Sequence, residues 1–159
     1  MGVSSDAIEE IYTLLCQDPD TGAVPADVSS QINTSNNHES FFWRFRDGYD
    51  ISDAGVADRA MFVEYQGHNA PGTFGHPTDT QGTLRVEILI RYHVGDYDDE
   101  TQKVMADDFH LVRKILGRDS ARPNGVMGYR VTGSDKDTIG DKHGYLLVLT
   151  TEITLIGDT

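Results

Sequence analysis

The sequence has few of the residues that crosslink a chain, span a membrane or bind nucleic acid. Its single cysteine, Cys16, cannot form an internal disulfide. No apolar run approaches the roughly 20 residues that a transmembrane helix requires, so we expect no membrane partner. Lysine and arginine total 13 against 26 aspartates and glutamates, a formal net charge of −13. Duplex nucleic acid is bound by clustered cations that neutralise phosphates, and this composition excludes such a surface.

What the chain does contain is enough apolar material for one modest core. Its length of 159 residues, 38% of them hydrophobic, predicts a single domain over residues 1–159. Residues 1–6 hold neither a cationic nor an apolar segment, so we expect no secretory signal and a protein made in the cytoplasm. Cys16 follows Tyr12, Leu14 and Leu15, which indicates a buried small side chain rather than a reactive thiol.

The chain opens with a helical pattern and then loses all periodicity. Asp6 and Glu9 are spaced as in a capping box, and apolar residues then recur at helical spacing, which predicts a helix over residues 5–17. Residues 18–40 are rich in Asp, Ser, Asn, Gly and Pro. This composition predicts a long irregular connector.

Three strands are predicted next, separated by turns and one long loop. Aromatic and alternating patterns indicate strands over residues 41–46 and 59–65, and we expect the Gly- and Pro-containing loop 66–82 to project from the body. The clearest strand covers residues 83–94. One face of this strand is expected to be core: Leu84, Val86, Ile88, Ile90, Tyr92 and Val94. The other face is expected to be solvated: Arg85, Glu87, Arg91 and His93.

The last part of the sequence predicts a helix and two strands. After the acidic turn 95–99, apolar residues at helical spacing predict a helix that runs to about residue 116, with Asp98 and Asp99 where an N-cap and negative charge are favoured and Gly117 at the usual C′ position. Residues 125–133 and 145–156 alternate as strands, and we expect them to pair antiparallel. The charged segment 134–144 is predicted to be a projecting loop between them.

The element order is therefore α-β-β-β-α-β-β. Strands and helices that are segregated in this way are typical of an α+β fold. We expect a mostly antiparallel sheet with two helices packed on one face, the face that carries Val86, Ile88 and Ile90.

Motifs that carry chemistry are missing from the chain. The phosphate-cradling loops, the nucleophile elbow and the zincin helix do not occur, so we expect no catalytic residues, no enzyme activity and no cofactor. His93 and His110 are near Glu87 and Asp107 in sequence, but no nucleophile accompanies them, and we expect both histidines to be structural.

Two sets of side chains are of types that bind metals. His68 and His76 flank one loop, and Asp79 follows, but structural zinc favours closer spacing and cysteine ligands. The acidic run over residues 96–100 does not have the spacing of a calcium-binding loop, and negative charge at a helix start explains it. We therefore expect no bound metal.

Several segments together resemble one family. Residues 84–92 (LRVEILIRY), the acidic turn that follows them and the helical segment 107–116 resemble the tail terminator (tail completion) proteins of long-tailed bacteriophages. Residues 128–132 and 145–155 are similar to that family's closing pair of strands, and residues 5–17 to its opening helix. The resemblance covers most of the chain.

The resemblance implies a virion structural protein that acts by assembly. Such a subunit forms a homo-hexameric ring at the head-proximal end of the tail tube, stops tube polymerisation and offers a surface for head-tail joining. Its partners are the tail tube protein and the head-tail connector or neck protein, and it is assembled in the host cytoplasm into the neck region of the virion. DNA passes through the lumen without sequence-specific binding, which suits an acidic chain because like charges keep phosphates from adhering.

Two groups of residues are candidate contacts in such a ring. The loops supply candidates for contact with the subunit, tube or connector: His68, Asn69, Phe74, His76, Asp135, Lys136, Asp137 and Lys142. The acidic turn and the second helix supply candidates for the lumen or ring contacts: Asp96, Asp98, Asp99, Asp107 and Asp108. We expect Asp107 and Asp108 to face solvent or a neighbouring subunit.

Three other functions stay open at this point. A head-tail connector or neck subunit would also form a ring, and its position at the head vertex would distinguish it. A small metal-dependent enzyme would use His68, His76 or residues 96–100 and would hold tightly bound metal. An acidic adaptor that imitates nucleic acid would capture a basic partner in a salt-sensitive manner.

Overall fold

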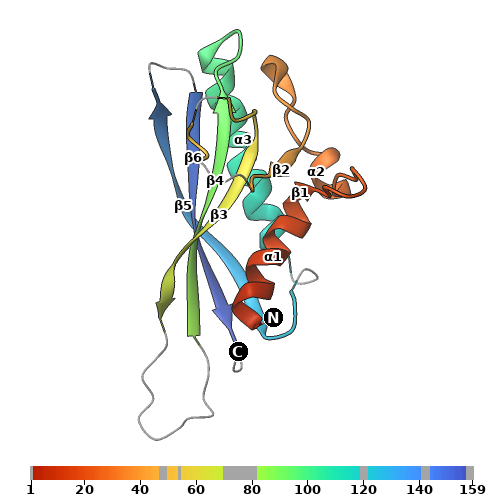
Figure 1. Cartoon of the computed structure of the whole chain (residues 1–159), viewed down its shortest axis with the longest axis vertical. Helices are drawn as coiled ribbons and strands as arrows, with labels where there is room; N and C mark the ends of the chain where they lie inside the picture. The colour runs from red at the N-terminus through yellow and green to blue at the C-terminus, as the bar shows by residue number, and fades with distance from the viewer. Residues whose placement is uncertain are drawn as a thin grey trace, which may run out of the picture.

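The computed structural model describes residues 2–46, 50–53, 55–69, 82–118, 122–140 and 144–156. Within these residues three α-helices pack against a six-stranded, mixed and mostly antiparallel open sheet (Figure 1). The helices are α1 (Val3–Leu15), α2 (Ala26–Ser29) and α3 (Asp98–Leu116), with one 3-10 turn, η1 (Ser35–Asn37). The strands are β1 (Cys16–Gln17), β2 (Phe42–Arg44), β3 (Ala60–Asn69), β4 (Gly82–His93), β5 (Val126–Ile139) and β6 (Gly144–Leu155). The expected α+β class with a mostly antiparallel sheet is confirmed.

The sheet has the strand order β1-β2-β3-β4-β6-β5. The four long strands pair antiparallel, and the register places Met61 opposite Ile90 and Ile88 opposite Leu149. The two short strands β1 and β2 extend the sheet in parallel, with Cys16 opposite Phe42. The antiparallel pairing predicted for the last two strands is confirmed, whereas the parallel edge was not predicted because two- and three-residue strands carry no periodic signal.

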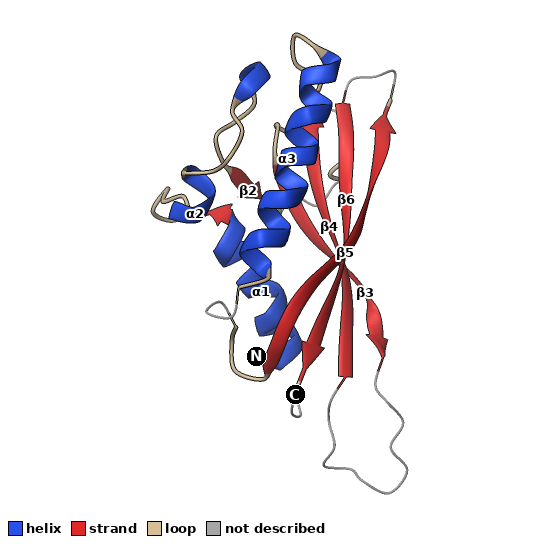
Figure 2. Cartoon of the chain, turned by 180° about the vertical axis from the view of Figure 1, so that it is seen from behind, coloured by secondary structure: helices blue, strands red, loops and turns tan. Residues whose placement is uncertain are grey.

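The core lies between the sheet and the helices α1 and α3, which cover the same face (Figure 2). Alternation along β4 places Leu84, Val86, Ile88, Ile90 and Tyr92 in this core, and each of these side chains is fully buried. The expected core face is therefore confirmed for these five residues, whereas Val94, the sixth residue predicted for this face, lies beyond the end of β4 and is half-buried. Burial of apolar surface at about 25 cal/mol per Å² is the main force that holds such layers together.

The other face of the sheet is only partly solvated. Leu89 and Arg91 point to this face, yet they are 7% and 3% exposed. The segment after β2 folds across the sheet and buries Leu89 in a second, smaller apolar cluster with Phe45 and Val56. The expectation that Arg91 is solvated is thus wrong. The segment after β2, whose sequence has no periodic pattern, covers this part of the sheet.

Helix α1 begins and ends two residues earlier than residues 5–17, the predicted range. It ends at Leu15 because Cys16 adopts extended backbone and pairs with Phe42. The Cys16 side chain is 5% exposed, so the prediction of a buried cysteine is confirmed. A long-range strand pairing thus ends a helix whose local pattern could continue.

The segment 18–40 is more regular than the predicted connector. It contains α2 and η1, and Val28 of α2 is fully buried against the main core. Asp27 forms an ion pair with Arg118, and Gln31 accepts a hydrogen bond from Lys114, so the segment is held against the end of α3. A buried side chain and polar contacts near the end of α3 thus help to define its path.

Two predicted loops are shorter than expected. Strand β3 continues to Asn69 and β4 begins at Gly82, so the ends of the loop 66–82 are strand. Strand β5 continues to Ile139, which corrects the loop 134–144 over most of its length. The positions between the paired strands, residues 70–81 and 141–143, lie outside the described residues.

Helix α3 ends at Leu116, as predicted, and begins at Asp98, within the segment predicted to be an acidic turn. Its N-cap is Tyr97, which makes no side-chain capping hydrogen bond, and Gly117 ends the helix in right-handed rather than left-handed backbone. Three acidic residues in the first turn and Arg113 and Lys114 in the last turn complement the helix dipole. No helix in the described ranges is both long and apolar enough to cross a bilayer.

Candidate functional site

The edge of the sheet along β5 is exposed over much of its length. In the described part of the chain β5 pairs with β6 on one side only, because it is the last strand of the sheet. Its residues 134–138 are all exposed. A strand edge of this kind presents unpaired backbone N–H and C=O groups that another chain can meet.

A groove follows this edge. It has a volume of about 280 Å³ and lies between α3 and the second half of β5. Met105, Phe109 and His110 of α3 form one wall, and Asp135 and Lys136 of β5 form the other. The groove thus combines an apolar floor with a charged rim, which is the usual composition of a protein-protein contact. Asp135 and Lys136 were predicted as contacts, whereas Phe109 was not.

A one-residue bulge decides which way the β5 side chains face. Val131 is opposite Thr151 and Gly133 is opposite Thr150, so Thr132 is the additional residue. After the bulge the alternation is inverted, because side chains in a strand have a period of two. Lys136 therefore faces α3, and Asp135 faces the other side of the sheet.

Lys136 connects this edge to the start of α3. Its Nζ donates to the Gln102 amide oxygen at 3.2 Å and lies 4.8 Å from the centre of the Tyr145 ring. The Tyr145 hydroxyl donates in turn to Asp98, and this hydrogen bond raises the pKa of the phenol. Asp98 is thereby engaged within its own subunit, and the Asp137 side chain stays exposed on the sheet.

A second bulge positions His68 at the other end of the molecule. Tyr65 is opposite Val86 and Gly67 is opposite Arg85, and Gly67 has a φ of +125°, which favours glycine. The inversion places His68 on the helix side of the sheet. There its Nε2 lies 2.9 Å from the Ser4 hydroxyl, and its Nδ1 lies 2.7 Å from the Tyr65 hydroxyl.

These contacts hold the end of β3 against the start of α1. Asn69, the last residue of β3, is exposed. Phe74, His76 and Lys142, the other predicted loop contacts, lie outside the described residues. His68 is therefore partly engaged inside the subunit, and Asn69 is the more available side chain of the two.

The acidic residues near α3 fall into three environments. Asp96 accepts a hydrogen bond from Asn37 at 3.2 Å, and Asp107 accepts one from Asn33 at 2.7 Å, so both hold the 18–40 segment. Asp99 is exposed in the first turn of the helix. Of the predicted acidic contacts, Asp99 is thus the freest to face a lumen.

Asp108 is not a surface residue, which corrects the expectation that it faces solvent or a neighbour. Its carboxylate is fully buried and accepts two hydrogen bonds from Arg59, at 2.9 and 2.8 Å, and one from the Tyr92 hydroxyl at 2.5 Å. Desolvation by burial raises the pKa of Asp108, although Arg59 and Tyr92 oppose this effect. No local pattern in the sequence indicates this pairing, because Arg59 lies 49 residues away.

A second buried polar group surrounds His38. His38 Nδ1 donates to Asp58 at 2.8 Å, and His38 Nε2 lies 3.2 Å from the Thr101 hydroxyl. The residue types are those of a catalytic triad, but Thr101 is fully buried and His38 is 7% exposed. These hydrogen bonds, together with the one from the His93 backbone N–H to Asp58 at 3.0 Å, join the connector to β4 and α3.

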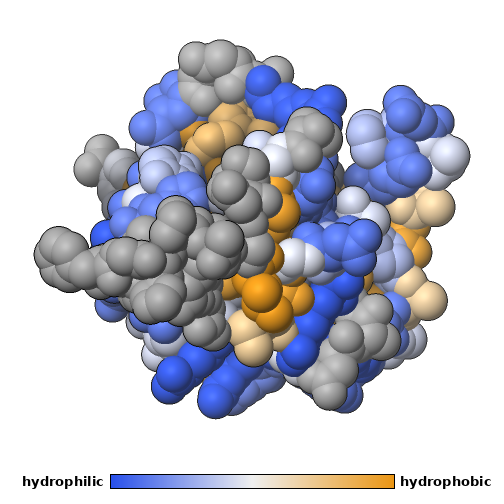
Figure 3. Space-filling model, turned by 90° about the horizontal axis from the view of Figure 1, so that it is seen from below, coloured by the Kyte–Doolittle hydropathy of each residue, from blue (hydrophilic) through white to orange (hydrophobic). Residues whose placement is uncertain are grey.

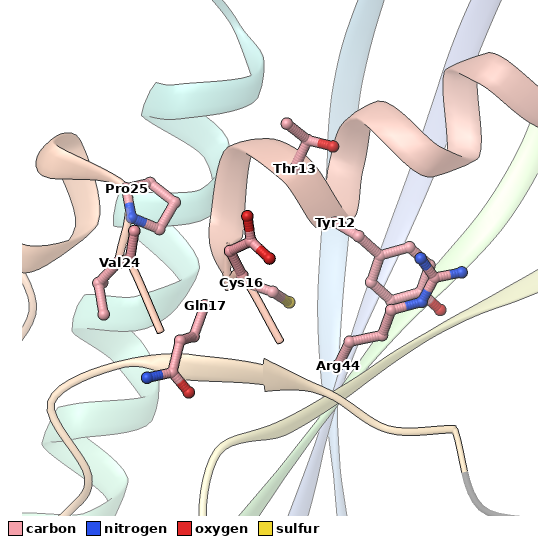
Figure 4. A pocket seen from close by; sticks show the side chains of 9 residues that line it. Tyr12, Thr13, Cys16, Gln17, Val24, Pro25 and Arg44 are labelled. Carbon is pink, nitrogen blue, oxygen red and sulfur yellow. The ribbon is translucent and has the colours of Figure 1, made fainter. Parts of the chain in front are cut away.

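The pocket in Figure 4 lies between the end of α1 and the following segment and has a volume of about 400 Å³. The Arg44 guanidinium lies over the Tyr12 ring at 4.0 Å and makes two hydrogen bonds to Glu9, at 2.6 and 2.8 Å. Cys16 also lines the pocket, and burial raises the pKa of its thiol to about 12. A raised pKa disfavours the reactive thiolate, and the Cys16 side chain packs in the main core.

The described ranges contain no cluster of three or more His, Cys, Asp or Glu side chains that could hold a metal ion. Of the zinc set weighed from sequence, His68 is bonded to Ser4 and Tyr65, while His76 and Asp79 lie outside the described residues.

Comparison with models of protein families finds no family that matches the chain. No curated protein matches its sequence either.

Proposed function

We propose that the chain is a phage tail terminator, a subunit that assembles into a ring at the head-proximal end of the tail tube. The observation that carries this proposal is the free β5 edge beside the groove lined by α3. The resemblance of residues 84–92, 107–116, 128–132 and 145–155 to tail terminators supports it, and the α+β fold with helices on one face of an open sheet is compatible with that family.

The edge and the groove suit head-to-tail assembly. A ring closes when each copy offers one surface to its neighbour and receives the neighbour's different surface. The exposed residues 134–138 form one such surface on β5, and the Phe109 side of the groove adds apolar contact area. Assembly would cover an edge that is an aggregation hazard in an isolated subunit.

The charge of the chain fits a conduit for DNA. The formal net charge of −13 is repeated in every copy, and Asp99 and Asp137 are exposed. A ring of such subunits repels phosphates, and DNA therefore passes without adhering. Few basic residues are therefore expected in a protein whose lumen conducts DNA.

The lower end of the molecule offers a different kind of surface. Figure 3 shows hydrophobic side chains gathered near the centre of this end. Ile156, which follows β6, is 51% exposed, and Met127, near the start of β5, is 40% exposed. We assign this end to contact with the tail tube or the connector, since exposed apolar groups mark interaction surfaces more often than chance.

Electron microscopy of negatively stained protein, combined with light scattering, tests the proposal. We expect rings with a central hole and a mass near six copies of the 17.6 kDa chain, about 106 kDa. Labelling on phage particles should place the ring at the end of the tail tube. A label on the head vertex would instead favour a connector or neck subunit.

A matched pair of variants tests whether the β5 edge forms the ring. The double variant Asp135→Lys/Asp137→Lys should prevent assembly, because it reverses two exposed charges on this strand. The double variant Asp20→Lys/Glu39→Lys changes the net charge equally at exposed positions of the connector and should assemble normally. Rings formed equally well by both variants would contradict the role of the edge, and a protein that stays monomeric even with tail tubes would contradict the proposed function.

A further inference from the structure

A pocket of about 510 Å³ lies at the end of the sheet, on the face opposite α1 and α3. Arg91 and His93 of β4 line it together with Asp53 from the segment that crosses this face. Val94 and Ile139, both half-buried, add an apolar wall. The pocket is separate from the groove beside α3 and from the pocket that contains Cys16.

Arg91 is an unusual residue in this pocket. Its side chain is nearly fully buried, and Nη1 donates to the backbone carbonyls of Ile51 and Asp53, each at 3.1 Å. Its Nε is buried and has no hydrogen-bond partner within the described residues. The guanidinium thus uses one of its three nitrogens for hydrogen bonds that hold the crossing segment.

The charge of Arg91 is only partly balanced. Burial lowers the pKa of Arg91 and the nearby Asp53 carboxylate raises it, but a guanidinium stays protonated in proteins. The Asp53 carboxylate accepts a hydrogen bond from the Asp50 backbone N–H at 3.0 Å and makes no ion pair with Arg91. Among the described residues, Arg91 has no carboxylate within ion-pair distance.

Other arginines of the chain have the carboxylate partner that Arg91 lacks among the described residues. Arg44, Arg59 and Arg118 each form an ion pair with a carboxylate, and Arg59 does so while fully buried. The chain has twice as many acidic as basic residues, so carboxylates are plentiful as counterions. A buried cation without a counterion costs several kcal/mol of stability, so an unpaired arginine in a pocket indicates an anion that the described fold does not supply.

We propose that this pocket binds a carboxylate group, with Arg91 as its cationic partner and the Val94 and Ile139 side chains against its apolar part. A monovalent carboxylate suits the site better than phosphate, because Asp53 and the acidic chain repel a doubly charged ion more strongly. The carboxylate is either that of a small organic acid or an Asp or Glu side chain of a second copy. In the second case the pocket is a ring contact and rests on the proposed function.

Thermal unfolding tests for binding of a small carboxylate. Acetate at about 100 mM should raise the melting temperature of the wild type by about 3 °C relative to chloride at equal ionic strength. The variant Arg91→Met should lose this response. The variant Arg85→Met, which removes the same charge from the same face of β4 outside the pocket, should keep it.

Nuclear magnetic resonance provides a second readout, which is made on the wild-type protein. The Nε–H signal of Arg91 in the wild-type protein, identified by its loss in Arg91→Lys, should move in a saturable manner as acetate is added. Inorganic phosphate should move it less. A response to phosphate alone would overturn the assignment of a carboxylate.

Light scattering distinguishes the two sources of the group. If a second copy supplies it, acetate dissociates the assembly and Arg91→Met fails to assemble. If a small acid supplies it, assembly is unchanged while the acetate response remains. If acetate has no effect and Arg91→Met assembles normally, the carboxylate pocket is overturned while the proposed ring stands. If acetate has its effect but the protein forms no ring, the proposed ring is overturned while the carboxylate pocket stands.

Discussion

Arg59 and Asp108 hold opposite charges against each other inside the core, with neither side chain exposed to solvent. Arg59 precedes β3 and has a φ of +58°, a backbone region that is uncommon for residues other than glycine. Its third nitrogen donates to the Glu39 carbonyl, so one side chain connects the 18–40 segment, the sheet and α3. The pair therefore determines how three distant segments meet.

Removing one member of this pair should be strongly destabilising. Asp108→Ala leaves the Arg59 charge buried and uncompensated, and we expect the free energy of unfolding to fall by about 3–5 kcal/mol. Urea unfolding followed by circular dichroism measures the loss. Asp107→Asn, at the exposed neighbouring position, is the control and should change stability by less than about 0.5 kcal/mol. The double variant Arg59→Met/Asp108→Leu should recover much of the loss, and equal instability of the single and double variants would contradict this account.

The carboxylate of Asp58 should make stability depend on pH in the acid range. Burial raises the pKa of Asp58, but hydrogen bonds from His38 and from the backbone N–H groups of Glu39 and His93 outweigh it, and the pKa lies below its usual value near 4. A lowered pKa stabilises the folded state above the unfolded-chain value, and this contribution is lost as pH falls through the folded-state value.

Urea unfolding of wild type and Asp58→Asn from pH 7 to pH 2 measures this contribution as the difference between their free energies of unfolding. The stability gap between wild type and Asp58→Asn should be constant above about pH 4.5 and should shrink at lower pH. The same comparison with Asp99→Asn, an exposed carboxylate, should show no such narrowing. A gap that widens on acidification would show that the sign of the shift is wrong.

The thiol of Cys16 should be almost inert in the folded protein. Its side chain is 5% exposed and its pKa is raised to about 12, so the reactive thiolate is scarce at pH 8. We expect labelling by an aromatic disulfide reagent to be about 100-fold slower in native than in urea-unfolded protein. The double variant Cys16→Ala/Ser30→Cys, with the thiol at an exposed position, should react quickly in both states. Fast native labelling of the wild type would mean that the α1 end opens readily.

The two faces of β4 should respond differently to truncation. Ile88 is fully buried in the main core, and Ile88→Ala should cost about 2–5 kcal/mol through lost burial and the cavity that remains. Glu87 faces the other side, and Glu87→Ala should cost less than about 0.5 kcal/mol. Chemical denaturation of both variants measures the contrast. Similar losses would show that the strand is not oriented as described.

The elements that could be predicted are those whose signal is local. The course of α3 up to Leu116 and the core face of β4 follow from apolar residues that recur every three to four or every two positions. The burial of Cys16 also follows from its apolar neighbours. In each case a few adjacent residues contain the whole pattern.

The elements that could not be predicted depend on distant partners. β1 exists because Cys16 meets Phe42, and β5 continues past residue 133 because its charged half pairs with β6. The segment that covers Leu89 has no periodicity of its own. Pairing and burial at these places come from other parts of the chain, so no short window of sequence contains their signal.

The sequence by itself determined the α+β class, the two long helices and the apolar face of the sheet, because hydrophobic periodicity alone decides which side of an element is buried. Only the tertiary structure decided which polar residues are available. Single-residue bulges turned His68 toward α1 and Lys136 toward α3, and a partner 49 residues away drew Asp108 into the core. A polar side chain is as stable in water as it is in a satisfied buried pair, so its location depends on whether the fold supplies a partner.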